Sequence, residues 1–367
     1  VLAAAVHAPI RLPAGDLVVA DGSARLRVPE TVLGRLVAEI RAENLPHDLG
    51  RERLRARITD RLARQLESRG ESTGYAWTHR TSRSRPVRAV LDQAWPKIRP
   101  EDLLATLLSD PAVLAAAADG LLTPAEQAAV LRRRRSRRWS AADLVLLDET
   151  AGLLGHPESF GHIVVDEAQD LSPMECRVIA RRSRHGSLTV LGDLAQGTTP
   201  WAAADWPAQL THLGHPDAPV TALTRGFRVP AAVLEHANRL LPDLGVTVPA
   251  TTSVRTDGSL TIDGFPDVVT AVRAALTHQG SVAVIATEAR LAQVTADLAA
   301  AGLATLTPDQ DPSPVRVTTV PAHLAKGLEF DHVIVAGPDE IVAAEPRGLN
   351  RLYVVLTRAV SRLDILT

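Results

Sequence analysis

Short apolar runs rich in β-branched residues alternate with longer helical stretches in the second half of the chain. The runs lie at residues 162–165, 187–191, 220–223, 259–263, 281–286, 315–320 and 332–336. Apolar residues at helical spacing separate most of these runs, at residues 173–184, 230–241, 268–278 and 288–301. Strands that alternate with helices indicate parallel sheets covered on both faces. The pattern therefore predicts an α/β fold from residue 161 onward.

The first 150 residues have a different pattern, which is mainly helical and irregular. Two strand-like pieces lie at residues 17–20 and 24–28, and helical spacing covers residues 31–67 and 101–131. Thr123 and Pro124 have the character of a helix N-cap and first-turn pair. Residues 70–86 are polar and rich in Ser and Thr, so we expect a loop or a disordered segment there.

The distribution of strands predicts three regions. Residues 216–367 contain enough strand–helix units for a complete sheet domain, whereas residues 151–215 contain only two strands, too few for a stable sheet. We therefore predict a helical region over residues 1–150, part of a sheet domain over 151–215 and a complete sheet domain over 216–367. Since the chain begins with Val1 and the first sheet lacks partner strands, we expect a fragment whose missing strands lie upstream.

Composition narrows the class of protein. Hydrophobic residues make up 46% of the chain and charged residues 22%, as in a soluble globular protein. No stretch approaches the roughly 18 apolar residues that cross a bilayer, and the start lacks the basic region of a signal peptide. The single cysteine, Cys176, suits a reducing cytosol and packing within a helix, so we expect a cytoplasmic protein without a membrane partner. Because the net charge is −2, nucleic acid would have to bind at local patches.

The stretch HIVVDEAQD, residues 162–170, has the pattern of a buried parallel strand followed by acidic residues. Sheets of this class place ligands beyond the carboxyl ends of their strands, where Asp166 and Glu167 lie. Mg²⁺ prefers oxygen ligands, so Asp166 could hold the metal, while Glu167 could orient and polarise an attacking water. A solvated acidic loop is the alternative.

A second apolar strand ends in a Gly–Asp turn within LTVLGDLAQ, residues 188–196. Gln196 could sense a terminal phosphate by hydrogen bonding. An ordinary turn is the alternative, because a strand followed by Gly and Asp is common. Trp201 follows closely, and its flat indole could stack on an unpaired base. Packing in a core or an interface is the favoured alternative for Trp201, and more strongly so for Trp206.

Three further segments, which carry arginines or a polar turn, contain candidate site residues. In TALTRGFRVP, residues 221–230, Arg225 and Arg228 follow a strand end; arginine suits a transferring phosphoryl group because its ionised guanidinium forks onto oxygens. Phe227 between them could stack on a purine, and an exposed basic turn is the alternative.

The string KGLEF lies in a polar turn between two apparent strands, within residues 315–337. Glu329 could accept hydrogen bonds from a ribose, and His323 could reach a nucleic-acid backbone; a solvated turn is the alternative for both. In RLYVVLTRA, residues 351–359, a strand or a helix delivers Arg358 to a site.

Taken in order, VVDEAQD, LGDLAQ, LTRGFR, AKGLEF and YVVLTRA resemble motifs II to VI of the UvrD/Rep class of superfamily 1 helicases. The resemblance covers residues 162–359. It implies RecA-like P-loop NTPase parallel sheets, one partial and one complete, and a helicase that uses ATP and Mg²⁺ on nucleic acid, single-stranded DNA foremost. In that class the site forms between two RecA-like domains, so that domain closure and hydrolysis are coupled.

The resemblance also implies a role for each matching position. The catalytic group comprises a glutamate, a γ-phosphate-sensing glutamine and two arginine fingers: Glu167, Gln196, Arg228 and Arg358. Four residues are implied to bind ATP or its metal. Asp166 resembles the aspartate that holds magnesium, and Phe227 the aromatic residue that stacks on adenine. Glu329 resembles the acid that contacts the ribose, and Gly327 lies in the same turn. The residues assigned to nucleic acid are Trp201 and His323.

Within that class the chain is most similar to HelD, the member associated with RNA polymerase. The segments that carry this likeness precede the acidic motif: LPHDLGRERLRARITDRL, the WP at residues 95–96, and WSAADLVLLDETAGLLG. Fewer than a hundred residues separate Arg228 from Val315, where UvrD-type helicases have a large added domain and HelD-type proteins have none. The likeness implies a factor that uses ATP to clear or recycle RNA polymerase, with residues 1–150 resembling the HelD-specific insertion.

The chain departs from the family pattern in three respects. A phosphate-binding Walker A loop needs Gly-Lys-Ser/Thr, and neither lysine, Lys97 or Lys326, lies in such a string. The adenine-contacting glutamine motif is also missing, and Pro321 replaces the usual threonine. We therefore expect ATP hydrolysis in the full-length parent and none of note in this chain alone.

Three functions remain open on the sequence alone. The first is the HelD-type factor, the second is a conventional DNA-unwinding repair helicase, and the third is a noncatalytic polymerase-binding module with a vestigial ATP fold. The basic run LRRRRSRRW, residues 131–139, is compatible with phosphate binding, a solvated helix face or a docking surface.

Overall fold

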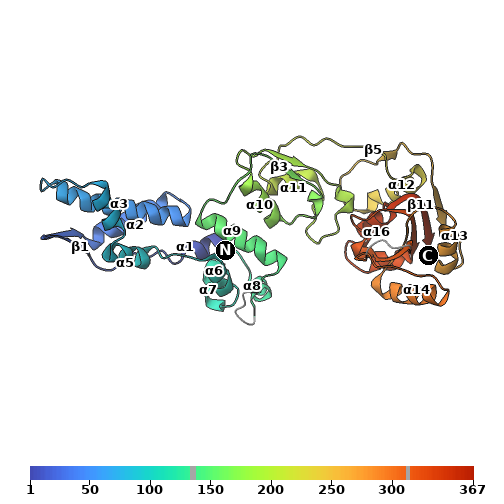
Figure 1. Cartoon of the computed structure of the whole chain (residues 1–367), viewed down its shortest axis with the longest axis horizontal. Helices are drawn as coiled ribbons and strands as arrows, with labels where there is room; N and C mark the ends of the chain where they lie inside the picture. The colour runs from blue at the N-terminus through green and yellow to red at the C-terminus, as the bar shows by residue number, and fades with distance from the viewer. Residues whose placement is uncertain (133–137, 311–314) are drawn as a thin grey trace. The chain divides into compact units, whose positions relative to one another are not determined.

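The computed structural model describes residues 1–132, 138–310 and 315–367 (Figure 1). Most of the basic run at residues 131–139 therefore lies outside the described residues. The chain divides into two compact units. Unit 1 comprises residues 1–160 and 177–184, and unit 2 comprises residues 161–176 and 185–367. The domain boundaries expected from the sequence, at residues 150 and 215, stay predictions.

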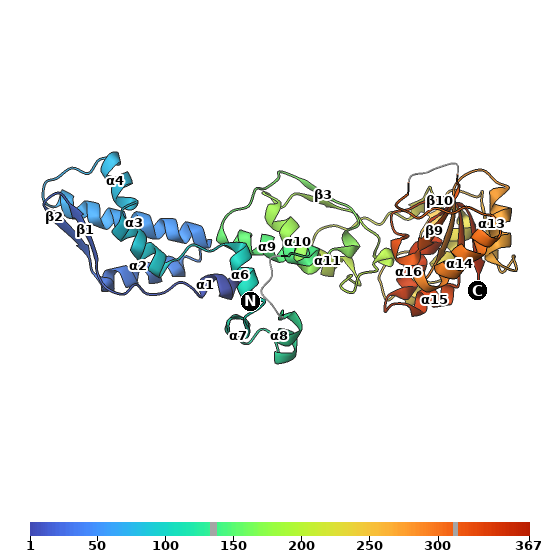
Figure 2. The ribbon, with the colours of Figure 1, turned by 60° about the horizontal axis from the view of Figure 1, so that its bottom comes forward.

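Unit 1 consists of helices and one antiparallel hairpin, which lies against a long helix in Figure 2. The hairpin strands are β1 (Leu17–Asp21) and β2 (Ala24–Val28), as the sequence predicts. The helices are α1 (Leu2–His7), α2 (Glu30–Ala42), α3 (His47–Glu67), α4 (Tyr75–Ser82), α5 (Arg85–Ala94), α6 (Pro100–Leu107), α7 (Pro111–Ala117), α8 (Pro124–Val130) and α9 (Ala141–Leu154). Thr123 caps α8 in a reciprocal capping box with Glu126, so the predicted helix start is confirmed.

A tryptophan fixes the core of this helical unit. Trp95 is 2% exposed, and its indole N–H donates to the carbonyl of His47 at 2.8 Å. The Arg51 guanidinium donates to the carbonyl of Leu91 at 2.7 Å, so α3 and α5 are joined by buried polar bonds as well as by apolar packing. Gly50 lies directly against the indole: a Cβ there would be 2.3 Å from Trp95 Cζ2.

The expectation of a loop or a disordered segment over residues 70–86 was wrong, because α4 occupies Tyr75–Ser82. Although the segment is polar, two residues one helical turn apart, Trp77 and Thr81, have buried side chains. Trp77 also donates its indole N–H to the carboxylate of Asp21 at 2.5 Å. Tertiary packing against α3, together with the hydrogen bond to the hairpin, thus stabilises a helix that has weak local propensity.

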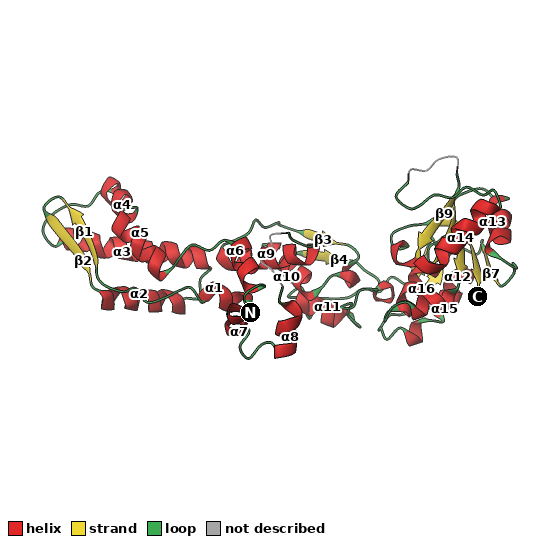
Figure 3. Cartoon of the chain, turned by 90° about the horizontal axis from the view of Figure 1, so that it is seen from below, coloured by secondary structure: helices red, strands yellow, loops and turns green. Residues whose placement is uncertain are grey.

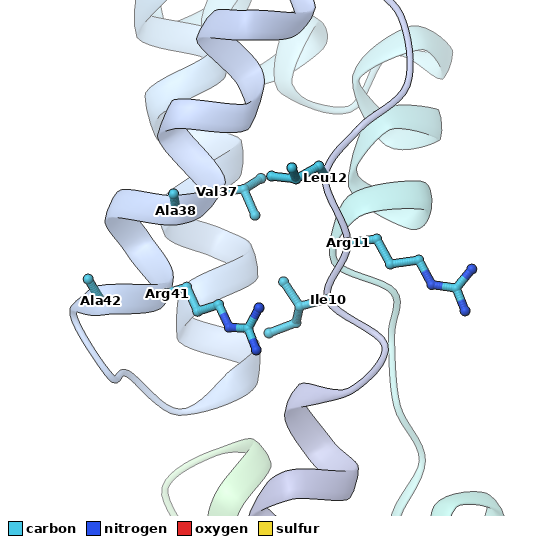
Figure 4. Close-up of a pocket in the computed structure, with 7 residues that line it drawn as sticks. All are labelled: Ile10, Arg11, Leu12, Val37, Ala38, Arg41 and Ala42. Carbon is cyan, nitrogen blue, oxygen red and sulfur yellow. The ribbon is translucent and has the colours of Figure 1, made fainter. Parts of the chain in front are cut away.

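A groove of about 470 Å³ lies in unit 1 between α2 and the extended segment that follows α1. Figure 4 shows Val37 and Leu12 facing one another across it, with Arg41 reaching toward Ile10 and Arg11 pointing away. None of the site residues expected from the sequence lines this groove.

Unit 2 is built on a five-stranded parallel sheet with strand order β7–β11–β10–β8–β9. The strands are β7 (Ser259–Ile262), β8 (Val282–Ala286), β9 (Val317–Pro321), β10 (Phe330–Ala336) and β11 (Ala359–Leu366). Helices cover both faces, as Figure 3 shows. On one face pack α13 (Val268–Leu276) and α14 (Glu288–Ala300); on the other pack α12 (Ala231–Asn238) and α16 (Gly348–Leu356), which α15 (Pro338–Ala343) precedes.

Alternation along the strands explains the two-sided cover. In β10, Val333 and Val335 belong to the core shared with α12 and α16, whereas Ile334 belongs to the core shared with α13 and α14. Every residue of β8 is buried, as expected of an interior strand of a parallel sheet. The α/β architecture with parallel sheets that the sequence predicts is therefore confirmed.

Two smaller parallel pairs complete unit 2. One joins β3 (Ile163–Val165) to β4 (Leu188–Val190), and the other joins β5 (Arg225–Gly226) to β6 (Thr252–Ser253). The prediction of a strand at residues 220–223 was wrong, because this run lies outside any strand. Leu223 is 80% exposed, since no neighbouring strand covers it. The helices α10 (Pro173–Arg182) and α11 (Trp206–His212) follow β3 and β4, respectively.

The described helices carry no membrane-spanning segment: none of those in residues 1–132, 138–310 and 315–367 combines the length and apolar character that a bilayer crossing needs.

Candidate functional site

The acidic turn after β3 presents two carboxylates in different settings. Glu167 has a left-handed backbone, with φ of 52°, immediately before a single 3₁₀ turn at Ala168–Asp170. This turn brings Glu167 Oε2 within 2.5 Å of the side-chain amide of Gln169, which donates to it. Asp166 is exposed, and one of its oxygens accepts the backbone N–H of Glu167 at 2.8 Å.

Lys326 is the cation that holds this acidic turn. It precedes Gly327, whose φ of 79° turns the chain between β9 and β10. Its ammonium group donates to Asp170 and to the carbonyl of Gln196 at 3.2 Å, and lies 3.2 Å from Glu167 Oε2. Lys326 thus connects the turn after β3, the turn after β4 and the KGLEF turn.

The charge of Glu167 follows from these partners. Partial burial raises the pKa of this carboxyl, but hydrogen bonds from Gln169 and Lys326 and the positive charges of Lys326 and Arg358 lower it more. The net pKa lies below the usual value, so Glu167 is ionised at neutral pH.

Arg358 lies just beyond α16 and is almost fully buried, with 4% of its surface exposed. Its guanidinium donates to the side-chain oxygen of Gln196 at 3.0 Å and to the carbonyl of Val354 at 3.0 Å. Burial and repulsion from Arg228 lower the pKa of Arg358, and nearby acids oppose this shift. Gln196 in turn donates from its amide to Asp193 at 2.9 Å, so its orientation is held from both ends.

Arg228 and Glu329 form an ion pair at the edge of the same site. Both side chains are about half exposed, at 42% and 47%, so this pair is open to exchange with a ligand. Arg225 belongs to β5 and is exposed.

Further contacts fix the loop after β4 against α16. The side-chain amide of Asn350 donates to the carbonyl of Ala195 at 3.1 Å, and Arg347 donates to the carbonyl of Gly197 at 3.1 Å. These bonds join residues 155 and 150 positions apart in sequence and set the position of Gln196 relative to Arg358.

The expected residues divide into two groups by position. Glu167, Gln196 and Arg358 are brought together with Lys326, and Arg228 pairs with Glu329. The second group comprises two residues whose side chains face solvent: Phe227, 73% exposed, and His323. Trp201 is intermediate, since it is 49% exposed while its indole N–H donates to the carbonyl of Asp170 at 2.8 Å.

Sequence reasoning missed Lys326, Gln169 and Asp170 as site residues. Lys326 carried a usable signal, because it is one of only two lysines in the chain and begins the KGLEF string. Gln169 is fully buried, and its side-chain oxygen accepts the backbone N–H of Asp193 at 3.1 Å, a positioning contact that no spacing rule reveals.

A single magnesium carboxylate is compatible with this geometry. Only one oxygen of Asp166 accepts a hydrogen bond in the described part of the chain, which leaves lone pairs for a hard cation. Among the same residues, no three His, Cys, Asp or Glu side chains converge as a self-sufficient metal site would require. Mg²⁺ would therefore need oxygens from a phosphate as additional ligands.

Comparison with protein families places one part of the chain. Residues 314–365 match the UvrD-like helicase C-terminal domain. This segment contains Lys326, Gly327, Glu329 and Arg358. No curated protein matches the chain.

Solved structures with some likeness include proteins described as helicases. The C-terminal domain of a possible DNA helicase from Lactobacillus plantarum WCFS1 is 22% identical with a TM-score of 0.30, and the match covers 39% of this chain and 87% of that one. An arterivirus nonstructural protein 10 helicase solved with DNA is 18% identical with a TM-score of 0.34, covering 57% of this chain and 40% of that one. The same arterivirus helicase in another crystal structure is 19% identical with a TM-score of 0.35 over the same shares. This chain thus spans less than half of the arterivirus helicase.

Proposed function

We propose that this chain is the later part of a superfamily 1 motor ATPase of the UvrD/Rep class, with one partial and one complete RecA-like domain. The observation that carries the proposal is the hydrogen bond from Arg358 to Gln196 at 3.0 Å. It joins a buried arginine beside α16 to the phosphate-sensing position after β4, and Glu167 lies next to both through Lys326. The match of residues 314–365 to the UvrD-like helicase C-terminal domain supports the same conclusion.

Each charged group of the site has a role in ATP hydrolysis. Glu167 is ionised and accepts a proton from the attacking water, which it also orients. Arg358 and Arg228 stabilise charge on the transferring phosphoryl group, because guanidinium groups remain ionised and fork onto its oxygens. The side chains of Gln196 and Glu329 contact these two arginines, and the terminal phosphate would replace them.

The remaining nucleotide contacts belong to exposed side chains. Phe227 would stack on adenine, Glu329 would accept from the ribose once Arg228 releases it, and the Gly327 turn would border the nucleotide. Asp166 would hold Mg²⁺ together with phosphate oxygens, and the ion would supply charge neutralisation at the phosphates. These 367 residues contain no Gly-Lys-Ser/Thr string, so a phosphate-binding loop would have to come from a longer parent.

Single-stranded DNA is the proposed track for the motor. The exposed half of the Trp201 indole would stack on a base, and His323 would contact the backbone from its exposed turn. Pro321 stands at the end of β9 where the family pattern has a threonine, so we do not assign a nucleic-acid contact to this position.

A finer proposal is a HelD-type factor that uses ATP to clear or recycle RNA polymerase. Its support is the interval between Arg228 and Val315: the described residues there form α12, β6, β7, α13, β8 and α14, and these elements belong to unit 2 without an added domain. The helical unit 1 would provide the polymerase contact. A conventional repair helicase is the alternative, and vigorous strand displacement by the parent without polymerase would favour it.

The decisive experiment measures phosphate release by the full-length parent with and without single-stranded DNA. We expect nucleic-acid-stimulated ATPase in the parent and none of note in the 367-residue chain. Glu167→Gln in the parent should abolish turnover and spare nucleotide binding, because the amide keeps the volume but cannot accept the proton. Glu158→Gln, the same change at an exposed glutamate outside the site, is the control. An unchanged rate in Glu167→Gln would refute its role, and a parent without ATPase would favour the vestigial binding module.

A further inference from the structure

Unit 1 contains a basic stretch that the motor site does not use. Residues 72–91 include four arginines and no acidic residue, in a chain whose net charge is −2. The stretch forms α4 (Tyr75–Ser82), a short turn and the first part of α5 (Arg85–Ala94). Positive charge is therefore concentrated on two consecutive helices, although the chain as a whole carries no basic excess.

An aromatic pair lies on the exposed side of α4. Tyr75 is 86% exposed, and its ring stacks on that of His79 one helical turn later, with centroids 5.9 Å apart and an interplanar angle of 29°. The two rings form a flat platform on the surface, whereas Trp77 between them points into the core. Tyr75 is one of only two tyrosines in the chain, and the other, Tyr353, is buried.

Three of the four arginines are available to a ligand. Arg83, Arg85 and Arg88 are exposed, and none forms an ion pair within the described residues. Arg88 donates to the carbonyl of Arg83 at 3.3 Å, which places its guanidinium at the C-terminal end of α4. Arg80 differs, since it lies 3.4 Å from Asp21.

Two acids near the patch, Asp21 and Asp92, are already engaged. Asp21 accepts the indole N–H of Trp77 and pairs with Arg80, and Asp92 on α5 pairs with Arg51 at 2.5 Å. Their negative charge is therefore compensated, and the field around Arg83, Arg85 and Arg88 stays positive.

We propose that this basic–aromatic patch, defined by Tyr75, His79, Arg83, Arg85 and Arg88, binds single-stranded nucleic acid. Bases stack on the Tyr75–His79 platform, and the arginines contact the phosphates of the same strand. Stacking accepts any base because every base has a flat face, so the patch binds without sequence preference. The binding is independent of ATP and of the motor site in unit 2.

The composition of the patch favours nucleic acid over an acidic protein segment. A protein partner would be anchored by apolar side chains in a buried centre. Between residues 75 and 88 the only Val, Leu or Ile is Val87, and it is fully buried. Flat rings beside unpaired guanidinium groups are what an unstacked strand requires.

The test is fluorescence anisotropy of the full 367-residue chain with labelled poly-dT and poly-rU of about 20 nucleotides, longer than the roughly 4–16 nucleotides that a single domain covers. Tyr75→Ala should weaken binding by roughly tenfold, because a base can no longer stack there. Arg83→Ala with Arg85→Ala should reduce the slope of log affinity against log salt by about 1.4, or roughly 0.7 for each phosphate that is no longer neutralised. Binding of either polymer supports the proposal, and a preference for poly-rU assigns a role to the 2′-hydroxyl.

Controls separate the patch from other sites and from misfolding. Arg64→Ala removes another exposed arginine from α3, where Asp60 pairs with it at 3.0 Å, and should leave affinity unchanged. Trp201→Ala tests the motor track in unit 2. If the patch variants bind like Arg64→Ala while Trp201→Ala abolishes binding, the patch proposal is overturned. It is equally overturned if the patch variants lose affinity for a polyglutamate peptide but keep that for both oligonucleotides.

Discussion

The contacts of Lys326 with three partners allow a quantitative prediction of its contribution to the stability of unit 2. Lys326→Met keeps the apolar stem and removes the ammonium group that contacts Asp170, Glu167 and the carbonyl of Gln196. The lysine side chain is only 17% exposed, so water replaces these partners poorly. Charged hydrogen bonds contribute about 1.5–3 kcal/mol each when desolvated, but Glu167 is half exposed, so we discount the sum to about 2 kcal/mol.

That loss of stability should be visible by calorimetry. For a unit of this size, 1 kcal/mol shifts the unfolding midpoint by about 2–4 °C, so the transition of unit 2 should fall by about 4–8 °C at pH 7. Lys97→Met is a matched control, because Lys97 is the only other lysine, is exposed and belongs to unit 1. A midpoint for unit 2 that falls no further in Lys326→Met than in Lys97→Met would refute the reasoning.

The same variant has a predicted pH dependence. The pKa of Glu167 is lowered in the folded protein, partly by Lys326, although burial opposes this. A lowered pKa contributes stability above the unfolded value, and that contribution is lost as the pH falls through the folded value. The difference between wild type and Lys326→Met should therefore narrow below about pH 4. A constant difference down to pH 3 would show that Glu167 is not a partner in solution.

Three further outcomes are expected. Gly50→Ala should destabilise unit 1 by about 1–3 kcal/mol in denaturant unfolding. The cause is overpacking against Trp95, which exceeds the roughly 1 kcal/mol that alanine gains in helix propensity. An unchanged unfolding midpoint would contradict the close packing of Gly50 on Trp95. Arg358→Gln in the parent should lower the hydrolysis rate by roughly a thousandfold with little change in nucleotide affinity; a rate within tenfold of wild type would argue against an arginine finger. Burial raises the pKa of the Cys176 thiol to about 11, so native protein should resist iodoacetamide at pH 8 and react once unfolded; rapid native labelling would contradict the burial.

The sheet domain was predictable from the sequence because its interior strands are buried and therefore consist of short apolar runs. Residues 282–286 and 333–336 are continuous apolar segments, and both lie in interior strands of the parallel sheet. Predictions failed where burial depends on distant partners. The Val220–Leu223 run has strand-like composition without a neighbouring strand, whereas α4 has polar composition but packs through Trp77.

The site was predictable only in part, for the same reason. The acidic turn after β3 and the arginine after α16 could be selected as candidates from local strings. The contact between Lys326 and Asp170 joins residues 156 positions apart, and no periodicity links them. Gln169 was equally hidden, since its role depends on full burial against Gly192, where a Cβ would be 2.4 Å from its side-chain oxygen.

The single buried cysteine makes the chain a convenient background for spectroscopy. Because Cys176 is fully buried, a cysteine introduced at any exposed position would be the reactive thiol, and no native residue would need to be removed first. One dye on α4 and another on α14 would then report by energy transfer on the separation of the two units in solution. Repeating the measurement with nucleotide on the parent would reveal whether ATP changes that separation.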